Sequence, residues 1–223
     1  MSWDPIWNDI FKAQSWGKYP PEELIRFIAI HFYQASDRQK INILEIGCGM
    51  GANIWFLARE GFNTFGIDGS EIAIQECHRR LKQENLQANL KVGDIFYLEQ
   101  LYPTNSFDAV IDIGCLQCNR LESIRQILPQ IYKLLKPRGY IFSITGAYGS
   151  WGTHSGEEIE PGTFINISEG PLRNRGLNHL FTLEELGVLF GKYQNLQIEY
   201  SARSMLNRKH EYKTWVIQGT KAE

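Results

Sequence analysis

The stretch Ile43-Leu44-Glu45-Ile46-Gly47-Cys48-Gly49-Met50-Gly51 decides how the rest of the chain can fold. Its apolar first half indicates a buried β-strand, and its glycines follow at the carboxyl end of that strand. Glycine lets the backbone approach a ligand closely, and a helix over 53–60 would point free N–H groups at that ligand. The pattern predicts a ligand-binding turn. Gly47, Gly49 and Ala52 also satisfy the dinucleotide fingerprint G-x-G-x-x-G/A, so the turn alone leaves the ligand open.

Strands and helices alternate outward from this turn. We expect strands at 41–46, 63–67, 89–92, 109–113 and 140–145, with helices at 53–60, 70–84 and 121–135 between them. Such alternation indicates a parallel sheet with helices on both faces. Two last strands, 196–200 and 214–219, lack a helix between them and must be antiparallel neighbours. The predicted fold is therefore α/β, with a Rossmann-like seven-stranded, mostly parallel sheet, an antiparallel C-terminal strand and helices on both faces.

The 223 residues fit a single domain, 1–223, with one core. We divide it into an N-terminal helical cap (1–40), a ligand-binding core (41–145), a lid or substrate loop (146–178) and a C-terminal helix with a strand pair (179–223). The lid is glycine-rich and follows the carboxyl end of the fifth strand, where ligands of such sheets lie. We expect it to close over the site together with the aromatic segment 1–20, and to supply Trp151, His154 and Phe164 as a wall.

Two acidic residues end later strands of the predicted sheet. Asp68 can accept both hydroxyl groups of a ribose, a part that NAD and S-adenosylmethionine share. Asp94 can accept the amino hydrogen of adenine, while Ile95 covers one face of the ring. Each aspartate also has a simpler interpretation, Asp68 as an acid at a helix start and Asp94 as a turn residue.

Taken together, these motifs resemble those of the class I S-adenosylmethionine-dependent methyltransferases. Residues 43–51 are similar to the first motif of that family, and 66–70 to its acidic second motif. Residues 93–95 and 107–111 resemble the third and fourth, and 134–140 the turn before the fifth strand. The resemblance implies S-adenosylmethionine as cofactor and S-adenosylhomocysteine as product. It further implies cofactor contacts from Glu45, Gly47, Cys48, Gly49, Asp68, Gly69, Ser70, Asp94, Ile95, Asp112 and Gly114.

A methyl group on a sulfonium passes in line to a nucleophile, so the protein must mainly align the two and exclude water. Aromatic faces favour such a cation, which makes Trp16, Tyr19 and Trp151 candidate walls, with core packing as the alternative. An oxygen or nitrogen nucleophile can need a general base. His179, beside the lid, is the candidate catalytic residue, with a helix-entry role as the alternative.

Cys115 and Cys118 form a C-x-x-C pair. A zinc site needs about four ligands, and the sequence has no second cysteine pair. A redox pair would normally open a helix, whereas this one follows a strand. We interpret the two cysteines as lining of the cleft and predict no metal site.

The formal net charge of -2 gives no general attraction to phosphate backbones, so we expect no nucleic-acid partner. A basic cluster of Arg203, Arg208, Lys209 and Lys213 is interpreted as a solvated face. No apolar run approaches the roughly 20 residues that span a bilayer, and we see no secretory signal. With four cysteines, the expectation is a reduced, cytoplasmic protein.

The sequence therefore favours methyl transfer to an oxygen, nitrogen, sulfur or carbon atom of a small molecule. An NAD-dependent oxidoreductase would explain the glycines and Asp68, but not the motifs at 107–111 and 134–140. A non-catalytic nucleotide-binding module and a nucleic-acid methyltransferase are further alternatives. Fold alone does not identify the acceptor, and the sequence leaves the oligomeric state open.

Overall fold

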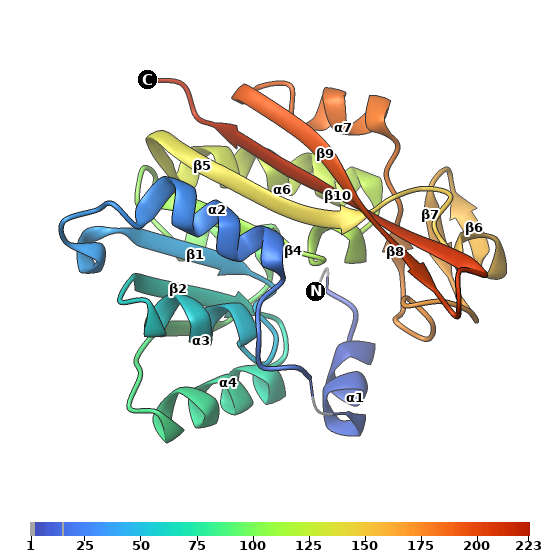
Figure 1. The fold of residues 1–223 in the computed structure, drawn as a ribbon, viewed down its shortest axis with the longest axis horizontal. Helices are drawn as coiled ribbons and strands as arrows, with labels where there is room; N and C mark the ends of the chain where they lie inside the picture. Colours follow the sequence, from blue (N-terminus) through green and yellow to red (C-terminus); the bar gives the residue numbers. More distant parts are fainter. Residues whose placement is uncertain (1–2, 15) are drawn as a thin grey trace.

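The main sheet of the protein has seven strands in the order β3-β2-β1-β4-β5-β10-β9 (Figure 1). The structure is a computed structural model that describes residues 3–14 and 16–223. Strands β1 to β5 are parallel, and β10 runs antiparallel to both β5 and β9. The predicted α/β fold is confirmed. The strand bounds are β1 Asn42–Ile46, β2 Asn63–Asp68, β3 Asn89–Val92, β4 Phe107–Ile113, β5 Leu135–Gly146, β9 Gln194–Met205 and β10 His210–Thr220.

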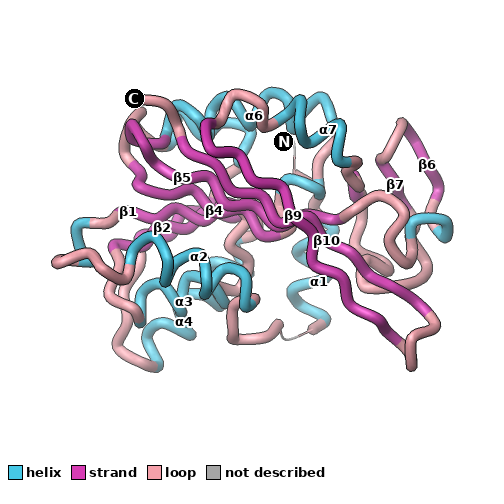
Figure 2. Tube along the Cα trace, turned by 45° about the horizontal axis from the view of Figure 1, so that its top comes forward, coloured by secondary structure: helices cyan, strands magenta, loops and turns pink. Residues whose placement is uncertain are grey.

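Helices cover both faces of this sheet (Figure 2). One face carries α2 (Glu22–Phe32), α3 (Ala52–Arg59) and α4 (Glu71–Gln83), and the other carries α5 (Leu98–Leu101), α6 (Leu121–Leu134) and α7 (Leu183–Leu189). Side chains alternate along a strand, so the neighbours Ile43 and Leu44 enter different cores. Because β1 is buried on both faces, its sequence is continuously apolar around Glu45. Short 3-10 helices span Arg38–Lys40, Ile95–Tyr97, Leu116–Cys118 and Thr153–Ser155.

Helix starts follow local capping chemistry. Ser70 precedes α4, and its hydroxyl accepts a hydrogen bond from the Ala73 N–H (3.3 Å). Thr182 does the same for α7 through the Glu185 N–H (3.2 Å). Gly51, with a φ of 81°, begins α3 in the left-handed region that glycine adopts without strain.

Three strands, β5, β9 and β10, exceed their predicted lengths by five residues or more, whereas β2 and β4 are longer by one and two. β5 begins at Leu135, because Phe107 pairs with Leu135 before the register slips and Ala109 pairs with Tyr140. The turn predicted before β5 is thus an irregularity within it. β9 and β10 pair with each other from Met205 and His210 onward, so their hairpin extends past the end of β5.

The lid segment 146–178 contains more structure than a loop. β6 (Glu157–Glu160), β7 (Thr163–Ile165) and β8 (Asn178–His179) form a small antiparallel sheet beside the start of β10 (Figure 1). These strands have two to four residues each. Such short strands leave no alternation for sequence analysis to detect.

The N-terminal cap begins with α1 (Ile6–Ala13), which packs against α4 rather than beside α2. Positions 1, 2 and 15 of the predicted cap lie outside the described residues. Phe11 is buried against Met50 and Ala73, which follow the ends of β1 and β2. The cap therefore lies over the carboxyl edge of the sheet. Within 3–14 and 16–223, no helix has the length and apolar character that a membrane crossing requires.

Candidate functional site

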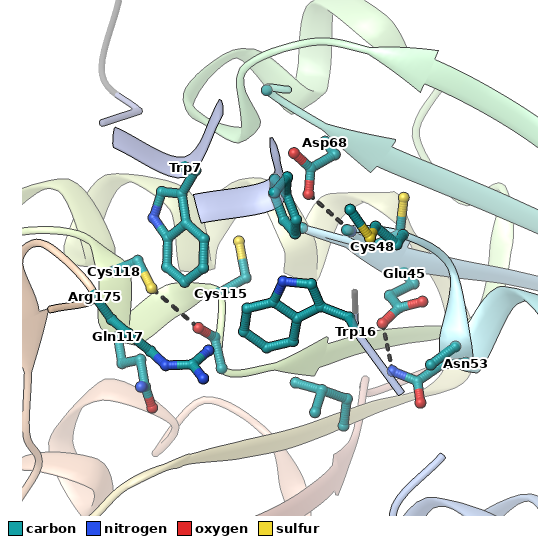
Figure 3. Close-up of a pocket in the computed structure, with 18 of the residues that line it drawn as sticks. Trp7, Trp16, Glu45, Cys48, Asn53, Asp68, Cys115, Gln117, Cys118 and Arg175 are labelled. Carbon is teal, nitrogen blue, oxygen red and sulfur yellow. Dashed lines mark hydrogen bonds between the residues drawn. The ribbon is translucent and has the colours of Figure 1, made fainter. Parts of the chain in front are cut away.

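A cavity of about 500 Å³ lies at the carboxyl ends of β1, β2, β3 and β4 (Figure 3). The strand order reverses between β1 and β4, which is where open α/β sheets bind ligands. The volume lies in the usual range of small-molecule sites, roughly 300–1,000 Å³. The N-terminal cap and the lid supply the remaining walls. Of the predicted site residues, the cavity is lined by Trp16, Tyr19, Glu45, Gly47, Cys48, Gly49, Asp68, Gly69, Ile95 and Gly114.

The glycine turn after β1 is shaped for a close approach of the backbone. Gly47 and Gly51 have φ values of 61° and 81°. A Cβ at Gly47 would collide with Cys115 Sγ, and one at Gly51 with Cys77 Sγ. Glycine is thus required both by conformation and by the thiols that fill the space behind the turn.

Asp68 joins the glycine turn to the start of α4. Its Oδ2 accepts the Gly49 N–H and its Oδ1 accepts the Ser70 N–H, both at 2.8 Å. Burial raises the pKa of this carboxyl, and the two N–H groups oppose that rise. A carboxylate can accept about four hydrogen bonds, so each oxygen keeps capacity for a further donor. The arrangement suits two vicinal hydroxyl groups.

Glu45 lies at the floor of the cavity and is almost fully buried. Its Oε1 accepts a hydrogen bond from Asn53 Nδ2 (2.6 Å), whereas Oε2 has no partner among the described residues. Burial raises the pKa of Glu45 to about 8, and the Asn53 bond acts in the opposite sense. A buried acceptor without a partner is costly, so this oxygen is where a donor or a cation on a ligand fits.

Asp112 is fully buried and does not line the cavity. It accepts hydrogen bonds from Cys115 N (2.9 Å), Leu116 N (3.0 Å) and Ser143 Oγ (2.6 Å). Burial raises its pKa to about 6. Asp112 therefore shapes the turn that brings Gly114 and Cys115 to the cavity, in place of the direct ligand contact that the sequence suggested.

Ser70 and Asp94 are two further predicted site residues that do not line the cavity. Ser70 is fully buried, and its hydroxyl donates to Asn8 Oδ1 of the cap (2.6 Å). Asp94 Oδ1 accepts the Phe96 N–H (3.0 Å) at the start of a 3-10 helix. Ile95 does line the cavity. The structure brings Asp94 close to the site without showing its carboxylate on the wall.

The cap is fixed to the core by Arg80 of α4. Its guanidinium donates to the Trp16 carbonyl (2.6 Å) and to the Gly17 carbonyl (3.0 Å). The Trp16 ring lies 5.9 Å from the Phe11 ring centroid, and Tyr19 meets Trp55 edge-on at 5.6 Å. The predicted aromatic segment thus forms one wall of the cavity.

The lid contributes Pro171, Leu172 and Arg175, and Tyr212 of β10 lies beside them. The prediction that Trp151, His154 and Phe164 line the cavity is wrong. Trp151 instead stacks on His210 at 4.2 Å. His154 lies with it in a separate surface depression, and Phe164 belongs to the lid's own apolar core. His210 is the first residue of β10 and lies in the part of the β9–β10 hairpin that extends past β5. Trp151 packs against this part of the hairpin and not against the cavity.

His179, the predicted base, does not line the cavity; its neighbour Asn178 does. Adjacent residues of a strand point to opposite sides, and β8 directs Asn178 inward. The imidazole is fully buried, with Nδ1 2.7 Å from Thr163 Oγ1 and Nε2 2.9 Å from Glu185 Oε2. Both ring nitrogens are engaged. This placement favours a role in holding the lid to α7.

Cys115 and Cys118 line the cavity, as expected. Burial raises the pKa of both thiols, and Cys118 Sγ donates to the Gly114 carbonyl (3.2 Å). All four cysteines are free thiols. In the part of the chain that the structure describes, no three His, Cys, Asp or Glu side chains gather as metal ligands.

Sequence analysis missed Arg80, Gln117, Arg175 and Tyr212. Gln117 lies inside the C-x-x-C pair predicted to line the cleft, and Arg175 lies in the predicted lid, but no motif contains Arg80 or Tyr212. The segments of these four residues meet only through the fold.

Comparisons with known proteins agree with this geometry. A family model described as a methyltransferase domain matches residues 43–139. The chain is 28% identical over 225 residues to a tRNA N(3)-methylcytidine methyltransferase of Schizosaccharomyces pombe, covering 93% of this chain and 71% of that protein. It is 29% identical over 118 residues to a ubiquinone biosynthesis O-methyltransferase of Rickettsia canadensis, covering 53% of this chain and 47% of that protein.

Solved structures share the fold. A SAM-dependent methyltransferase of Methanosarcina mazei superposes with a TM-score of 0.69 at 23% identity, covering 86% of this chain and 96% of that one. The 1,6-didemethyltoxoflavin-N1-methyltransferase of Burkholderia thailandensis was solved with S-adenosylhomocysteine. It has a TM-score of 0.64 at 16% identity, and the match covers 89% of this chain and 76% of that one.

Proposed function

We propose that this chain, which belongs to the class I S-adenosylmethionine-dependent methyltransferases, methylates an oxygen, nitrogen, sulfur or carbon atom of a small molecule. The cofactor and the methyl transfer come with the family, whereas the acceptor class is our proposal. The observation that carries it is the cavity, which is walled by aromatic and aliphatic side chains of the cap and the lid. Such concave, mostly apolar sites with a few polar groups are typical of small-molecule binding.

The described residues fit the cofactor. Asp68 would accept the ribose hydroxyls, Ile95 with Asp94 would hold the adenine, and Gly47 and Gly49 would lie against the methionine part. The Oε2 of Glu45, which has no partner among the described residues, would accept a hydrogen bond from a cationic ligand once that cation favours the ionised carboxylate. When bound, S-adenosylmethionine supplies a methyl group on a sulfonium.

The contribution of the chain to the reaction is alignment and exclusion of water. Trp7, Phe11 and Trp16 of the cap cover the site from one side, and Leu172 of the lid covers it from another. Among the described residues, no histidine lines the cavity. We therefore assign the transfer to positioning and give His179 the role of holding the lid.

The formal net charge of -2 is consistent with a small acceptor, because it offers no general attraction to a phosphate backbone. The four free cysteines favour a reducing compartment, and we place the protein in the cytoplasm.

A tRNA acceptor is the second candidate. The fission-yeast tRNA methyltransferase aligns with 93% of this chain, so the match includes parts of the cap and lid as well as the core. Exposed basic side chains on the β9–β10 hairpin, Arg203, Arg208 and Lys209, would meet phosphates in that case.

A labelling experiment separates the two acceptors. The purified protein is given methyl-tritiated S-adenosylmethionine with either the small-metabolite fraction or the total tRNA of a cell extract. We expect label in the metabolite fraction, and Asp68→Ala should abolish it. Label confined to tRNA would replace our proposal with the second candidate.

A further inference from the structure

We infer that the small-molecule acceptor carries an anionic group, a carboxylate or a phosphate, which Arg175 and Tyr212 bind at the lid side of the cavity. This inference rests on the proposed function and narrows its substrate class. It comes from the shape and charge of a part of the cavity that the cofactor motifs do not occupy.

Arg175 is a partly buried cation that lines the cavity. Its guanidinium lies 4.2 Å above the Trp16 ring, yet it has no carboxylate partner among the described residues. Burial lowers its pKa, which reflects the cost of an unpaired charge away from water. Arg38, Arg80 and Arg120, by contrast, each have a glutamate within 3.4 Å. A partly buried guanidinium that lacks a carboxylate partner beside a cavity is a binding group for an anion.

The backbone at Arg175 is held in place by a chain of amide hydrogen bonds. Asn178 Nδ2 donates to the carbonyls of Arg175 and Gly176, each at 3.3 Å. Gln117 Nε2 donates in turn to Asn178 Oδ1 (3.1 Å). Gln117 Oε1 accepts the Gly146 N–H at the end of β5 (2.7 Å). The lid thereby presents Arg175 at a fixed point relative to the ends of β4 and β5.

Tyr212 supplies a second donor to the same place. It lines the cavity from β10, and its hydroxyl has no hydrogen-bond partner among the described residues. Burial raises its pKa while the neighbouring Arg175 opposes that rise, so the hydroxyl stays protonated at neutral pH. A planar guanidinium fork with a phenolic O–H beside it matches the oxygens of a carboxylate or phosphate.

The cofactor has a carboxylate of its own, on its methionine part, so the anion has two possible sources. Most of the acids and glycines predicted to hold the cofactor lie at the ends of β1, β2 and β3, and Gly114 follows β4, whereas Arg175 belongs to the lid. In Figure 3, Trp16 stands between Arg175 on one side and Glu45 with Asn53 on the other. This separation assigns Arg175 to the acceptor.

Ligand-observed NMR on protein saturated with S-adenosylhomocysteine tests the assignment. The probes are benzoate and phenyl phosphate, with benzamide and benzyl alcohol as their neutral counterparts. We expect the two anions to bind at least about tenfold more tightly, as a hydrogen bond to a charged group implies. Arg175→Gln should remove that preference, and Arg175→Lys should keep part of it. Arg173→Gln, a matched change at an exposed position of the same loop, should leave it intact.

The affinity for S-adenosylhomocysteine distinguishes the two sources. We expect Arg175→Gln to change it by less than about threefold, with an unchanged melting temperature as the check on folding. A loss as large as that caused by Asp68→Ala would place the cofactor carboxylate at Arg175 and overturn the inference. Anions that bind no better than their neutral counterparts, or do not bind, would overturn it too. Neither result affects the labelling experiment with methyl-tritiated S-adenosylmethionine, which tests methyl transfer separately.

Discussion

The two ends of the cavity are built in different ways. At the cofactor end, most of the predicted contacts come from short turns at the ends of β1, β2 and β3, each of them a contiguous motif, and Gly114 follows β4. At the lid end, Trp16, Gln117, Arg175 and Tyr212 come from four segments far apart in the sequence. The first end can be predicted from local sequence, whereas the second exists only once the chain has folded. Under our proposal, cofactor and acceptor recognition are therefore encoded on different length scales.

The two ends also differ in charge. Glu45 and Asp68 lie at the cofactor end, whereas Arg175 lies at the lid end, where the Asp4 carboxylate is near Gly176 but forms no ion pair with Arg175 among the described residues. An acidic pocket suits a cationic donor, and an unpaired arginine suits an anionic acceptor. The following predictions test this difference, beginning with the largest effect.

Asp68→Ala should weaken binding of S-adenosylmethionine on the order of a hundredfold, because two hydrogen bonds to a charged group contribute about 1.5 kcal/mol or more each. The change also removes the acceptor of the Gly49 and Ser70 N–H groups. Calorimetry with the cofactor measures the effect. Glu122→Ala, which removes an exposed carboxylate on α6, is the control and should bind normally. Equal affinities of the two variants would remove Asp68 from the site.

Glu45→Gln should change how stability depends on pH. The folded-state pKa of about 8 lies above the value of about 4.3 for an exposed glutamate. The contribution of Glu45 to stability is therefore complete below about pH 4 and is lost as the pH rises through about 8. Asp112, with a pKa of about 6, acts in the same direction over a lower range.

Urea unfolding of the cofactor-free protein at pH 5 and pH 8.5 measures this effect. Between pH 5 and pH 8.5, the free energy of unfolding of wild type should fall by on the order of a few kcal/mol relative to that of Glu45→Gln. The exposed control Glu122→Gln should follow wild type. If the free energy of unfolding changes equally with pH in wild type and Glu45→Gln, the buried carboxyl is already ionised at pH 5.

His179→Gln should destabilise the protein by about 1–3 kcal/mol, because the buried Thr163 and the partly buried Glu185 lose their hydrogen bonds to the imidazole. Cofactor affinity should stay within twofold, since the ring does not line the cavity. Thermal unfolding and calorimetry measure the two quantities, with the exposed His154→Gln as control. Methyl transfer lost at unchanged stability would restore His179 as a base.

Arg80→Met should weaken binding of S-adenosylhomocysteine about tenfold, because the cap loses two charge-assisted hydrogen bonds. Hydrogen exchange should rise at 16–19 while the sheet stays protected. Arg79→Met is the matched control, since Arg79 also pairs with Glu76 but is exposed and does not reach the cap. Identical exchange in both variants would mean that Arg80 does not fix the cap.

Much of the fold could be predicted because its information is local. The apolar run at 43–46 and the glycines after it determine a strand, a turn and a helix within a few positions. Asp68 and Ile95 follow strand ends, so their approach to one edge of a parallel sheet follows from topology.

The rest of the fold and of the site could not be predicted, because it depends on strand pairings that no local sequence pattern indicates. His179 differs from Asn178 by one position in β8, and that single step decides which of them faces the cavity. Trp151 lies outside the site because it stacks on His210 of the long β9–β10 hairpin. The sequence around Trp151 does not specify the length of that hairpin. Asp112 shows a third case, in which a residue predicted to contact the cofactor is buried and accepts the backbone N–H groups of the next turn.

The position of the cap also bears on how fast the enzyme can turn over. A Cβ on Gly69 would come within 2.5 Å of the Trp3 ring, and one on Gly49 within 3.4 Å of the Phe11 ring. A ribose that approached Asp68, as we propose, would therefore have to pass these two rings. We expect the cap to swing aside once for fresh cofactor to arrive and once for spent cofactor to leave, so that hinge motion sets the pace. Multiple-turnover rates should then fall as solvent viscosity rises, while a single turnover started from the loaded enzyme should not.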